Sequence, residues 1–245
     1  MPVPSQTSSH TPTTTRQAVI AVRSLRKVYD EDGVPVEAVR GIDMEIASGE
    51  FTAIVGPSGS GKTTLLNLIA GLDTPTEGSV TLAGKPISEM SGGELSDFRR
   101  DHIGFIFQAY NLIPVLTVEE NIEYIMLLQG VDKAKRHARV KEILGRMDLD
   151  GYQDRLPTKL SGGQQQRVAV ARAMAAEPDL ILADEPTANL DTETGGALLD
   201  MMRELNETTG MTFVFSTHDE LVMERARRLI VLRDGDIHKD ERQDG

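Results

Sequence analysis

The stretch GPSGSGKTT, which spans Gly56–Thr64, decides the fold, because its residues have the spacing G-x-x-x-x-G-K-[ST] of a phosphate-binding loop. Glycines let consecutive backbone N–H groups turn toward phosphate oxygens, and a following helix presents its free N–H groups to the same anion. Lys62 supplies a positive charge to the β- and γ-phosphates of a nucleotide, and the Thr63 hydroxyl reaches Mg²⁺. An apolar run at 51–55 precedes the loop, and a helical pattern follows it. The predicted nucleotide-binding residues are Gly56, Pro57, Ser58, Gly59, Ser60, Gly61, Lys62, Thr63 and Thr64.

The composition of the 245 residues limits what the rest of the chain can be. Asp and Glu number 38 against 26 Lys and Arg, and the net charge of −12 disfavours a protein that coats nucleic acid. The absence of cysteine rules out disulfides and cysteine-ligated metal sites. No apolar run approaches the ~18–20 residues of a membrane span. Residues 1–17 are rich in Ser, Thr and Pro and predict a disordered tail, and we expect 239–245 to be a frayed C-terminus.

Short apolar runs alternate with helical patterns along the remaining chain, which is typical of an α/β fold. Runs without polar alternation predict strands buried on both faces, as in a parallel sheet, and alternating segments predict strands with one exposed face. Thr117 and Ser161 stand where helix N-caps belong. We expect strands at 18–25, 42–46, 51–55, 103–107, 180–183, 212–216 and 229–232, and helices at 62–70, 118–129, 133–147, 162–176, 193–208 and 219–226.

Two adjacent carboxylates follow a predicted buried strand in LILADEP, Leu180–Pro186. Asp184 stands at the strand end, where the ligands of open α/β sheets collect, and we expect it to coordinate Mg²⁺ through water. Glu185 is placed to orient or deprotonate the water that attacks a phosphate. Solvent exposure or helix capping is the alternative for such a pair, and the phosphate-binding loop favours the catalytic interpretation.

A serine and two glycines open an amphipathic helix in LSGGQQQR, Leu160–Arg167. This segment is similar to a second phosphate-binding helix N-terminus. Because Gly56–Thr64 already serves one nucleotide, we predict that the second segment serves a nucleotide held by a partner subunit. A plain N-capped helix is the alternative. The residues predicted to act on the partner's nucleotide are Ser161, Gly162, Gly163 and Gln164.

Two other segments invite a functional interpretation that their sequences do not support. MSGGELSDFRR at 90–100 lacks the preceding Leu and the following glutamines, and it predicts a turn and a polar helix capped by Ser91 or Ser96. The basic run at 133–141 predicts a solvated helix face, and a contact with lipid headgroups is the alternative.

The three motifs, in this order, make the chain similar to the ATP-binding subunits of ABC transporters, and the resemblance covers 18–238. It implies an α/β P-loop (RecA-like) core with an antiparallel β part and an inserted helical subdomain at about 88–172. Tyr29 resembles the aromatic residue that stacks on adenine. Gln108 resembles the glutamine that contacts Mg²⁺ and links to the membrane partner, and His218 the histidine that contacts the γ-phosphate.

The resemblance implies an ATPase in which two copies face head-to-tail and enclose two ATP molecules. Its partner would be a membrane-spanning permease, so that the chain would lie in the cytoplasm, peripheral to the cell membrane, and would bind no nucleic acid. The resemblance implies catalytic roles for Glu185, His218, Lys62 and Gln108, and Mg²⁺ binding by Thr63, Gln108 and Asp184.

Three stretches, 87–122, 156–173 and 183–191, are similar to the lipoprotein-release and macrolide-export group of these ATPases. That group powers export or substrate extraction by a separate membrane subunit. The cell-division ATPase, which transmits force across the membrane, is a close alternative. A soluble ABC ATPase that acts on nucleic acid is less favoured, because the short spacing between Lys62 and Leu160 leaves no room for a coiled coil and there is no cysteine for zinc.

Overall fold

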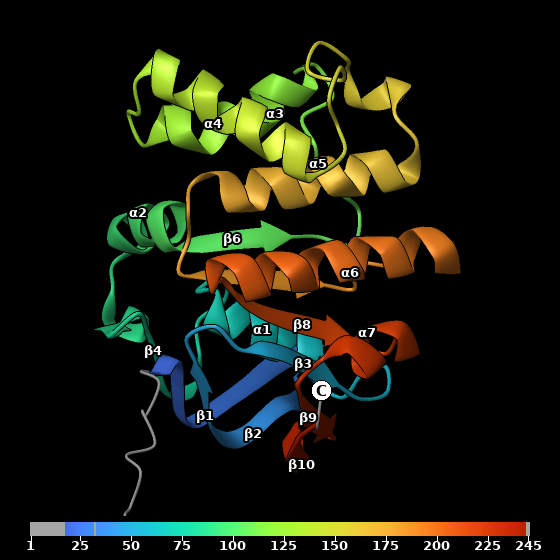
Figure 1. Cartoon of the computed structure of the whole chain (residues 1–245). Coiled ribbons are helices and arrows are strands. Elements are labelled where there is room, and N and C mark those ends of the chain that lie inside the picture. The colour runs from blue at the N-terminus through green and yellow to red at the C-terminus, as the bar shows by residue number, and fades with distance from the viewer. Residues whose placement is uncertain (1–17, 32, 244–245) are drawn as a thin grey trace, which may run out of the picture.

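The structure, a computed structural model, describes residues 18–31 and 33–243 and contains two β-sheets with helices between and around them (Figure 1). The strands are β1 (Ala18–Glu31), β2 (Val34–Ala47), β3 (Phe51–Val55), β4 (Glu77–Leu82), β5 (Lys85–Pro86), β6 (Ile103–Ile106), β7 (Leu180–Asp184), β8 (Thr212–Thr217), β9 (Arg228–Arg233) and β10 (Asp236–Arg242). The helices are α1 (Lys62–Ile69), α2 (Gly92–His102), α3 (Val118–Leu128), α4 (Lys133–Arg146), α5 (Gly162–Ala175), α6 (Thr192–Thr209) and α7 (Glu220–Arg225), with 3₁₀ turns at Ile87–Glu89 and Pro157–Lys159.

The larger sheet has the strand order β10-β9-β3-β8-β7-β6. All of its neighbouring strands are parallel except β9 and β10, which are antiparallel. β3 and β8 are buried at every residue, and β7 is buried up to Asp184, because helices or a second sheet cover both faces. The apolar runs without alternation therefore predicted this sheet correctly.

Two apolar cores lie on opposite faces of this sheet. One core joins alternate residues of the sheet, such as Ile54 and Val214, to α1 and to the antiparallel four-stranded sheet β2-β1-β4-β5. The other joins residues such as Ala53 and Phe213 to α5, α6 and α7. The loop between β3 and α1 therefore begins at the centre of the larger sheet and ends in a helix held between the two sheets.

The second core continues into a helical layer, in which α3 packs against both α4 and α5 (Figure 1). Side chains start these helices as the sequence predicted, since Thr117 accepts a hydrogen bond from the Glu120 N–H and Ser161 accepts one from the Gln164 N–H. β6 pairs with β7, so the chain returns to the larger sheet between α2 and α3. None of the helices among the described residues is long and apolar enough to cross a membrane.

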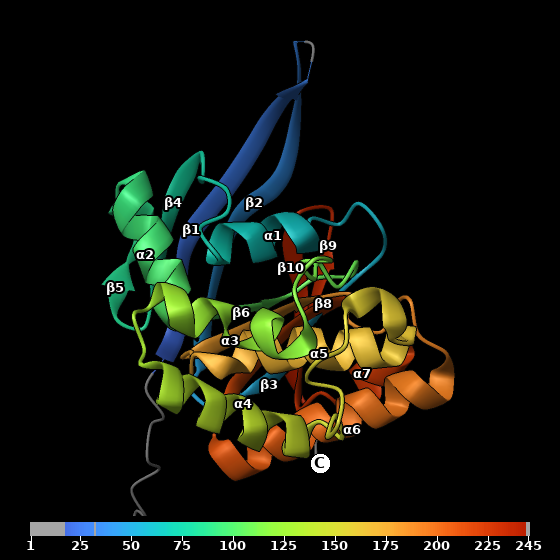
Figure 2. The same cartoon turned by 90° about the horizontal axis from the view of Figure 1, so that it is seen from above.

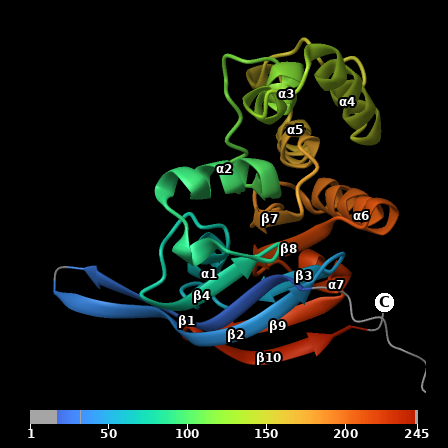
Figure 3. The ribbon, with the colours of Figure 1, turned by 90° about the vertical axis from the view of Figure 1, so that its left-hand side faces the viewer.

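The β1–β2 hairpin is much longer than predicted and projects from the body of the protein (Figures 2 and 3). Strands β4, β5 and β10 were not predicted, because β5 and β10 contain few apolar residues and the alternation in β4 is limited to Val80 and Leu82. The expected frayed end was wrong for residues 239–242, which complete β10. Arg228 holds this strand through two bonds from its guanidinium to the Asp240 carboxylate, at 2.7 and 2.8 Å. The expected tail at 1–17 lies outside the described residues.

Candidate nucleotide-binding site

The loop Gly56–Gly61 is shaped by close backbone contacts that only glycine permits. A Cβ at Gly56 would lie 2.2 Å from the Leu232 carbonyl oxygen of β9, and a Cβ at Gly61 would lie 2.3 Å from the Ala38 carbonyl oxygen of β2. Gly61 also has a φ of +98°, in the left-handed region. Neighbouring strands thus fix both ends of the loop, while Gly59 at its crest has no atom within 4 Å of a Cβ position.

Lys62 opens α1 and turns its ammonium back into this loop. Its Nζ donates to the carbonyl oxygens of Gly56 and Pro57, at 2.8 and 3.0 Å, and the residue is only 7% exposed. Beneath the crest, the Ser60 hydroxyl is buried without a hydrogen-bond partner among the described residues. A buried ammonium and an unpartnered hydroxyl in a glycine-lined cradle fit an anion with several oxygens.

The carboxylate of Asp184 lies next to the start of α1. β7 carries it there, and the Thr63 hydroxyl donates to its Oδ1 over 3.4 Å. Burial raises the pKa of Asp184, and the charge of Glu185 acts in the same direction; the hydrogen bond from Thr63 and the charge of Lys62 oppose this rise. A bound cation would stabilise the ionised form, so the site gains from a positive charge at this position.

Glu185 and His218, which are distant in sequence, are in direct contact. The Glu185 Oε1 atom lies 2.6 Å from the Nδ1 atom of His218, and the Thr217 hydroxyl donates to Glu185 Oε2 over 2.9 Å. The backbone of Glu185 is left-handed, with φ +46°, and its N–H donates to the carbonyl oxygen of Ser216. Parallel pairing of β7 with β8 brings the two segments together. Sequence reasoning missed Thr217, although it immediately precedes His218.

Gln108 follows β6 and is exposed. Its carbonyl oxygen accepts a hydrogen bond from Asn189 Nδ2 at 2.7 Å, so this segment is joined to the loop that follows Glu185. Tyr110 and Asn111, which follow Ala109, have left-handed backbones. Arg172 of α5 donates to both of their carbonyl oxygens, and burial lowers the pKa of this guanidinium. The signal in the sequence that could have indicated this contact is an arginine, Arg172, within the otherwise apolar stretch 168–175 of α5.

Tyr29 reaches the site from β1. Its hydroxyl donates to Asp73 Oδ2 over 2.6 Å. Burial raises the pKa of Tyr29, Asp73 adds to the rise, and a hydrogen bond from Thr64, at the end of the phosphate-binding loop, opposes it. The ring therefore lies beside the first turn of α1.

The helix N-terminus at Ser161 has different neighbours. A Cβ at Gly162 would lie 2.9 Å from the Tyr110 hydroxyl, and a Cβ at Gly163 would lie 2.5 Å from Thr194 Cγ2. None of these neighbours belongs to the phosphate-binding loop. One chain therefore presents Lys62, Asp184, Glu185 and His218 in one group and Ser161–Gln164 in another.

The described residues contain no group of three or more His, Asp or Glu side chains that could hold a metal by themselves. Mg²⁺ does not need one, because it commonly takes one or two protein oxygens, water and the oxygens of bound phosphates. The Thr63 hydroxyl and the Asp184 carboxylate at the open loop provide such a pair. The residues present fit a nucleotide with Mg²⁺.

The fold and the grouping of Lys62, Asp184 and Glu185 at the ends of parallel strands define a P-loop nucleoside triphosphatase core. Residues 39–188 match the family model described as ABC transporter. An ABC transporter ATP-binding protein of Thermotoga maritima is 48% identical over 220 residues, which cover 89% of this chain and 92% of that protein. The chain belongs to the ABC transporter family and is an ABC-type ATPase.

Further comparisons distinguish short relatives from longer ones. The macrolide export ATP-binding/permease protein MacB of Mannheimia succiniciproducens is 41% identical over 222 residues, but the match covers 91% of this chain and only 34% of MacB. Among solved structures, the ATP-binding cassette MJ0796 of Methanocaldococcus jannaschii, dimeric and bound to ADP and Pi, has a TM-score of 0.85 and 40% identity. That match covers 92% of this chain and 99% of the other. The chain thus spans about a third of the length of the export relatives.

Proposed function

We propose that this chain is the ATP-hydrolysing subunit of an exporter of the macrolide-export and lipoprotein-release group, and that it powers a separate membrane-spanning permease. The observation that carries the proposal is the division of the site: one chain holds the catalytic group near Lys62, and the second anion-binding helix end, at Ser161, lies elsewhere. Two copies arranged head-to-tail complete both sites. The dimeric cassette with ADP and Pi, similar over 92% of this chain, supports this arrangement.

In the proposed site, each chain grips the phosphates with the backbone N–H groups of Gly56–Gly61 and with the Lys62 ammonium. Thr63, Asp184 and Gln108 would hold Mg²⁺, which neutralises charge on the phosphates. Glu185 accepts a proton from the attacking water, and Thr217 orients the Glu185 carboxylate. His218 lies beside Glu185 and would donate to the γ-phosphate once the nucleotide is bound.

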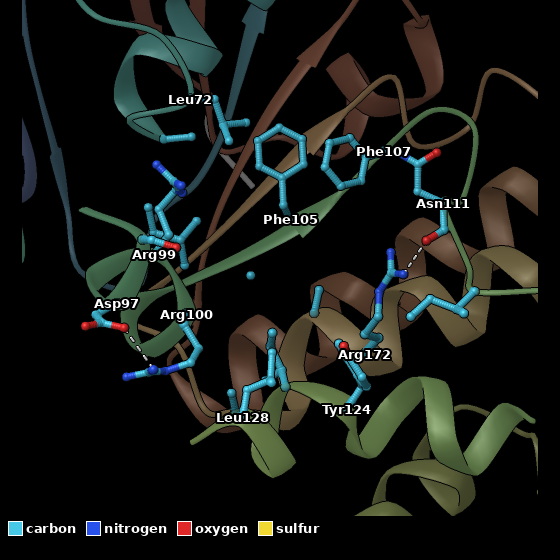
Figure 4. A pocket seen from close by; sticks show the side chains of 18 residues that line it. Leu72, Asp97, Arg99, Arg100, Phe105, Phe107, Asn111, Tyr124, Leu128 and Arg172 are labelled. Carbon is cyan, nitrogen blue, oxygen red and sulfur yellow. Dashed lines mark hydrogen bonds and ion pairs between the residues drawn. The ribbon is translucent and has the colours of Figure 1, made fainter. Parts of the chain in front are cut away.

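The proposed contact with the permease uses a cavity of about 630 Å³ between α2 and β6 on one side and α3 and α5 on the other (Figure 4). Leu72, Tyr124 and Leu128 line it and are 49%, 39% and 51% exposed. Exposed apolar side chains around a hollow are typical of a docking surface. Phe107 also lines the cavity and directly precedes Gln108, so a short cytoplasmic segment of the permease seated here would contact the nucleotide site through one residue.

The test of the shared site is the oligomeric state of Glu185→Gln. Loss of the general base should stop turnover and leave ATP binding intact, and removal of a negative charge near the γ-phosphate should stabilise the closed dimer. Light scattering should show a monomer without nucleotide and a dimer with ATP and Mg²⁺. Adding Lys62→Ala to Glu185→Gln should restore the monomer in ATP. Normal hydrolysis by Glu185→Gln would refute the catalytic role of this carboxylate.

The permease contact is tested separately with Leu128→Asp. This substitution should leave ATP binding unchanged, because Leu128 lies on α3, away from the phosphate-binding loop. It should release the chain from membranes of cells that express the complete transporter, measured as the bound fraction after sedimentation. Leu156→Asp, at an exposed leucine outside the cavity, is the matched control and should stay bound. Equal binding of both variants would contradict the proposed docking surface.

A further inference from the structure

The Tyr29 side chain contacts Asp73 and Lys27, two residues that belong to none of the motifs of the site. Its hydroxyl donates to Asp73 Oδ2 over 2.6 Å. The other carboxylate oxygen, Oδ1, accepts from Lys27 Nζ at 2.6 Å and from the Thr74 N–H at 2.7 Å. Lys27 also donates to the Thr74 carbonyl oxygen at 2.8 Å. Both carboxylate oxygens are thus occupied, and the phenol proton has a fixed acceptor.

This cluster also covers one face of the Tyr29 ring. Lys27 Nζ lies 4.8 Å from the ring centroid, within the range of a cation–π contact. The side chains of Lys27 and Asp73 are only 13% and 27% exposed, so their ion pair is less screened than one in open solvent. Tyr29 is partly exposed, so with the ammonium over one ring face we expect a flat ligand to stack on the other.

The protonation states support a fixed arrangement. Burial alone would raise the pKa of Asp73, but the hydrogen bonds from Lys27 and Tyr29 outweigh it and the pKa is lowered. Burial and the Asp73 contact raise the pKa of Tyr29. Near neutral pH the cluster therefore contains an ionised Asp73 carboxylate and a neutral Tyr29 phenol that donates a hydrogen bond to it.

Asp73 connects this ring to the phosphate-binding helix. It lies in the loop after α1, where the N–H groups of Leu72 and Asp73 both donate to the Asn67 carbonyl oxygen, at 2.8 and 3.3 Å. Lys27 and Tyr29 are on β1, in the projecting hairpin. The cluster therefore ties the hairpin to the C-terminal end of the helix whose N-terminus faces the phosphates.

We propose that Asp73 and Lys27 are positioning residues that hold the Tyr29 ring ready to receive the base of the nucleotide on its free face. This inference rests on the stacking role of Tyr29 within the proposed function. A ring that is already oriented loses less side-chain entropy when the base binds. Because the phenol proton is committed to Asp73, the ring offers its face to the base, and a stacked face accepts any base.

The test measures the affinity of the full-length chain for a non-hydrolysable ATP analogue by isothermal titration calorimetry, together with KM and kcat for ATP. Tyr29→Ala should raise the dissociation constant about tenfold or more. Asp73→Ala should raise it about threefold to tenfold, and should raise KM with little change in kcat, because stacking is present in the ground and transition states alike. Asp73→Asn, which keeps an acceptor for the phenol, should lie between the wild type and Asp73→Ala.

The double variant decides whether Asp73 acts through the ring. In the Tyr29→Ala background, Asp73→Ala should change the dissociation constant less than about twofold, because no ring remains to be positioned. An equal effect of Asp73→Ala with and without the ring would overturn the inference, and so would an unchanged affinity of Asp73→Ala. An unchanged affinity of Tyr29→Ala would refute the stacking role of Tyr29. The proposed phosphate site would still be tested separately, by adding Lys62→Ala to Glu185→Gln.

The matched control is Glu45→Ala, which removes a carboxylate paired with Arg23 on the same sheet. Glu45 lies outside the cluster and faces solvent, so its loss should leave the affinity for the ATP analogue unchanged. Thermal unfolding of every variant separates misfolding from loss of positioning. A drop in affinity that followed the melting temperature across all variants, Glu45→Ala included, would contradict the proposal.

Discussion

Two Ser-Gly-Gly segments, Ser91–Gly93 and Ser161–Gly163, begin helices with nearly the same backbone but offer different chemistry. The N-cap serines have φ/ψ of −65°/161° and −66°/163°. In each segment, the side chain three residues after the serine accepts a hydrogen bond from the serine N–H. At Ser91, the serine hydroxyl also donates a hydrogen bond to the Glu94 carboxylate, at 2.7 Å. At Ser161, the hydroxyl accepts from the Gln164 N–H, and its proton has no acceptor within the described part of the chain.

The difference concerns both charge and surroundings. A carboxylate at Glu94 neutralises the positive end of α2, whereas the neutral Gln164 leaves the positive end of α5 available to an anion. A Cβ at Gly93 would meet no atom within 4 Å, whereas one at Gly163 would meet Thr194 at 2.5 Å. The same local motif therefore starts a helix in both places, and of the two N-termini we propose only that of α5 for a partner's phosphate.

The largest expected effect comes from placing arginine at each serine. Ser161→Arg should reduce ATPase activity by about 100-fold or more and abolish the ATP-dependent dimer of Glu185→Gln, because its bulk blocks the partner's phosphate and its charge opposes the helix dipole. Ser91→Arg loses a helix cap and should cost about 1 kcal/mol of folding free energy, but it should keep the ATPase rate. Phosphate release and light scattering measure both. A dimer of Glu185→Gln/Ser161→Arg in ATP would rule out the shared site.

An intermediate effect is expected from substitutions at the third residue of each helix, Gln164 in α5 and Glu94 in α2. Gln164→Glu can still accept from the Ser161 N–H, so thermal stability should be kept or rise slightly. The added charge repels the γ-phosphate, and the dimer dissociation constant in ATP should rise about tenfold. Glu94→Gln should leave dimerisation unchanged. Analytical ultracentrifugation of both variants in the Glu185→Gln background tests this, and equal dimerisation would mean that charge at Gln164 is irrelevant to the interface.

The smallest effect is expected from replacing the second glycine of each segment, Gly163 or Gly93, and it concerns the free energy of unfolding. Gly163→Ala should lose about 1–3 kcal/mol, because its Cβ would collide with Thr194, whose hydroxyl is held by Asp191 at 2.7 Å. Gly93→Ala has free space and should gain up to about 1 kcal/mol from the lower entropy of the unfolded chain. Urea unfolding monitored by circular dichroism gives both values. Equal changes at the two positions would show that the crowding at Gly163 has no energetic effect.

The sequence predicted the parallel core well because both faces of its strands are apolar. The runs at 51–55, 180–183 and 212–216 became β3, β7 and β8 with small changes at their ends. β10 was not recognised, because its stability comes from Arg228, which pairs with Asp240 on β10 itself and with Glu50 beyond it, rather than from apolar side chains. Periodicity in a charged edge strand carries little signal because few of its side chains are apolar, although β10 pairs with the strand that directly precedes it, β9.

Gly56–Thr64, the Asp184–Glu185 pair and Ser161–Gln164 could be singled out from local sequence patterns, whereas Tyr29, Gln108 and His218 were proposed only from the family resemblance. The residues that orient them could not be singled out. Thr217 became visible only when β7 and β8 paired, and Asp73 only when the loop after α1 met β1. Arg172 is an arginine within an apolar stretch of α5, which the sequence shows. The sequence does not show that it donates to the carbonyl oxygens of Tyr110 and Asn111.

The sequence by itself determined the phosphate-binding loop, the α/β class and the helix starts, because glycine conformation, strand apolarity and N-capping act over a few neighbouring residues. The tertiary structure alone decided which Ser-Gly-Gly segment is crowded by Thr194 and Tyr110, which carboxylate accepts from the Tyr29 hydroxyl, and which hydroxyl donates to Glu185. These features depend on contacts between residues distant in the chain, and such contacts exist only once the two sheets and the helical layer have packed together.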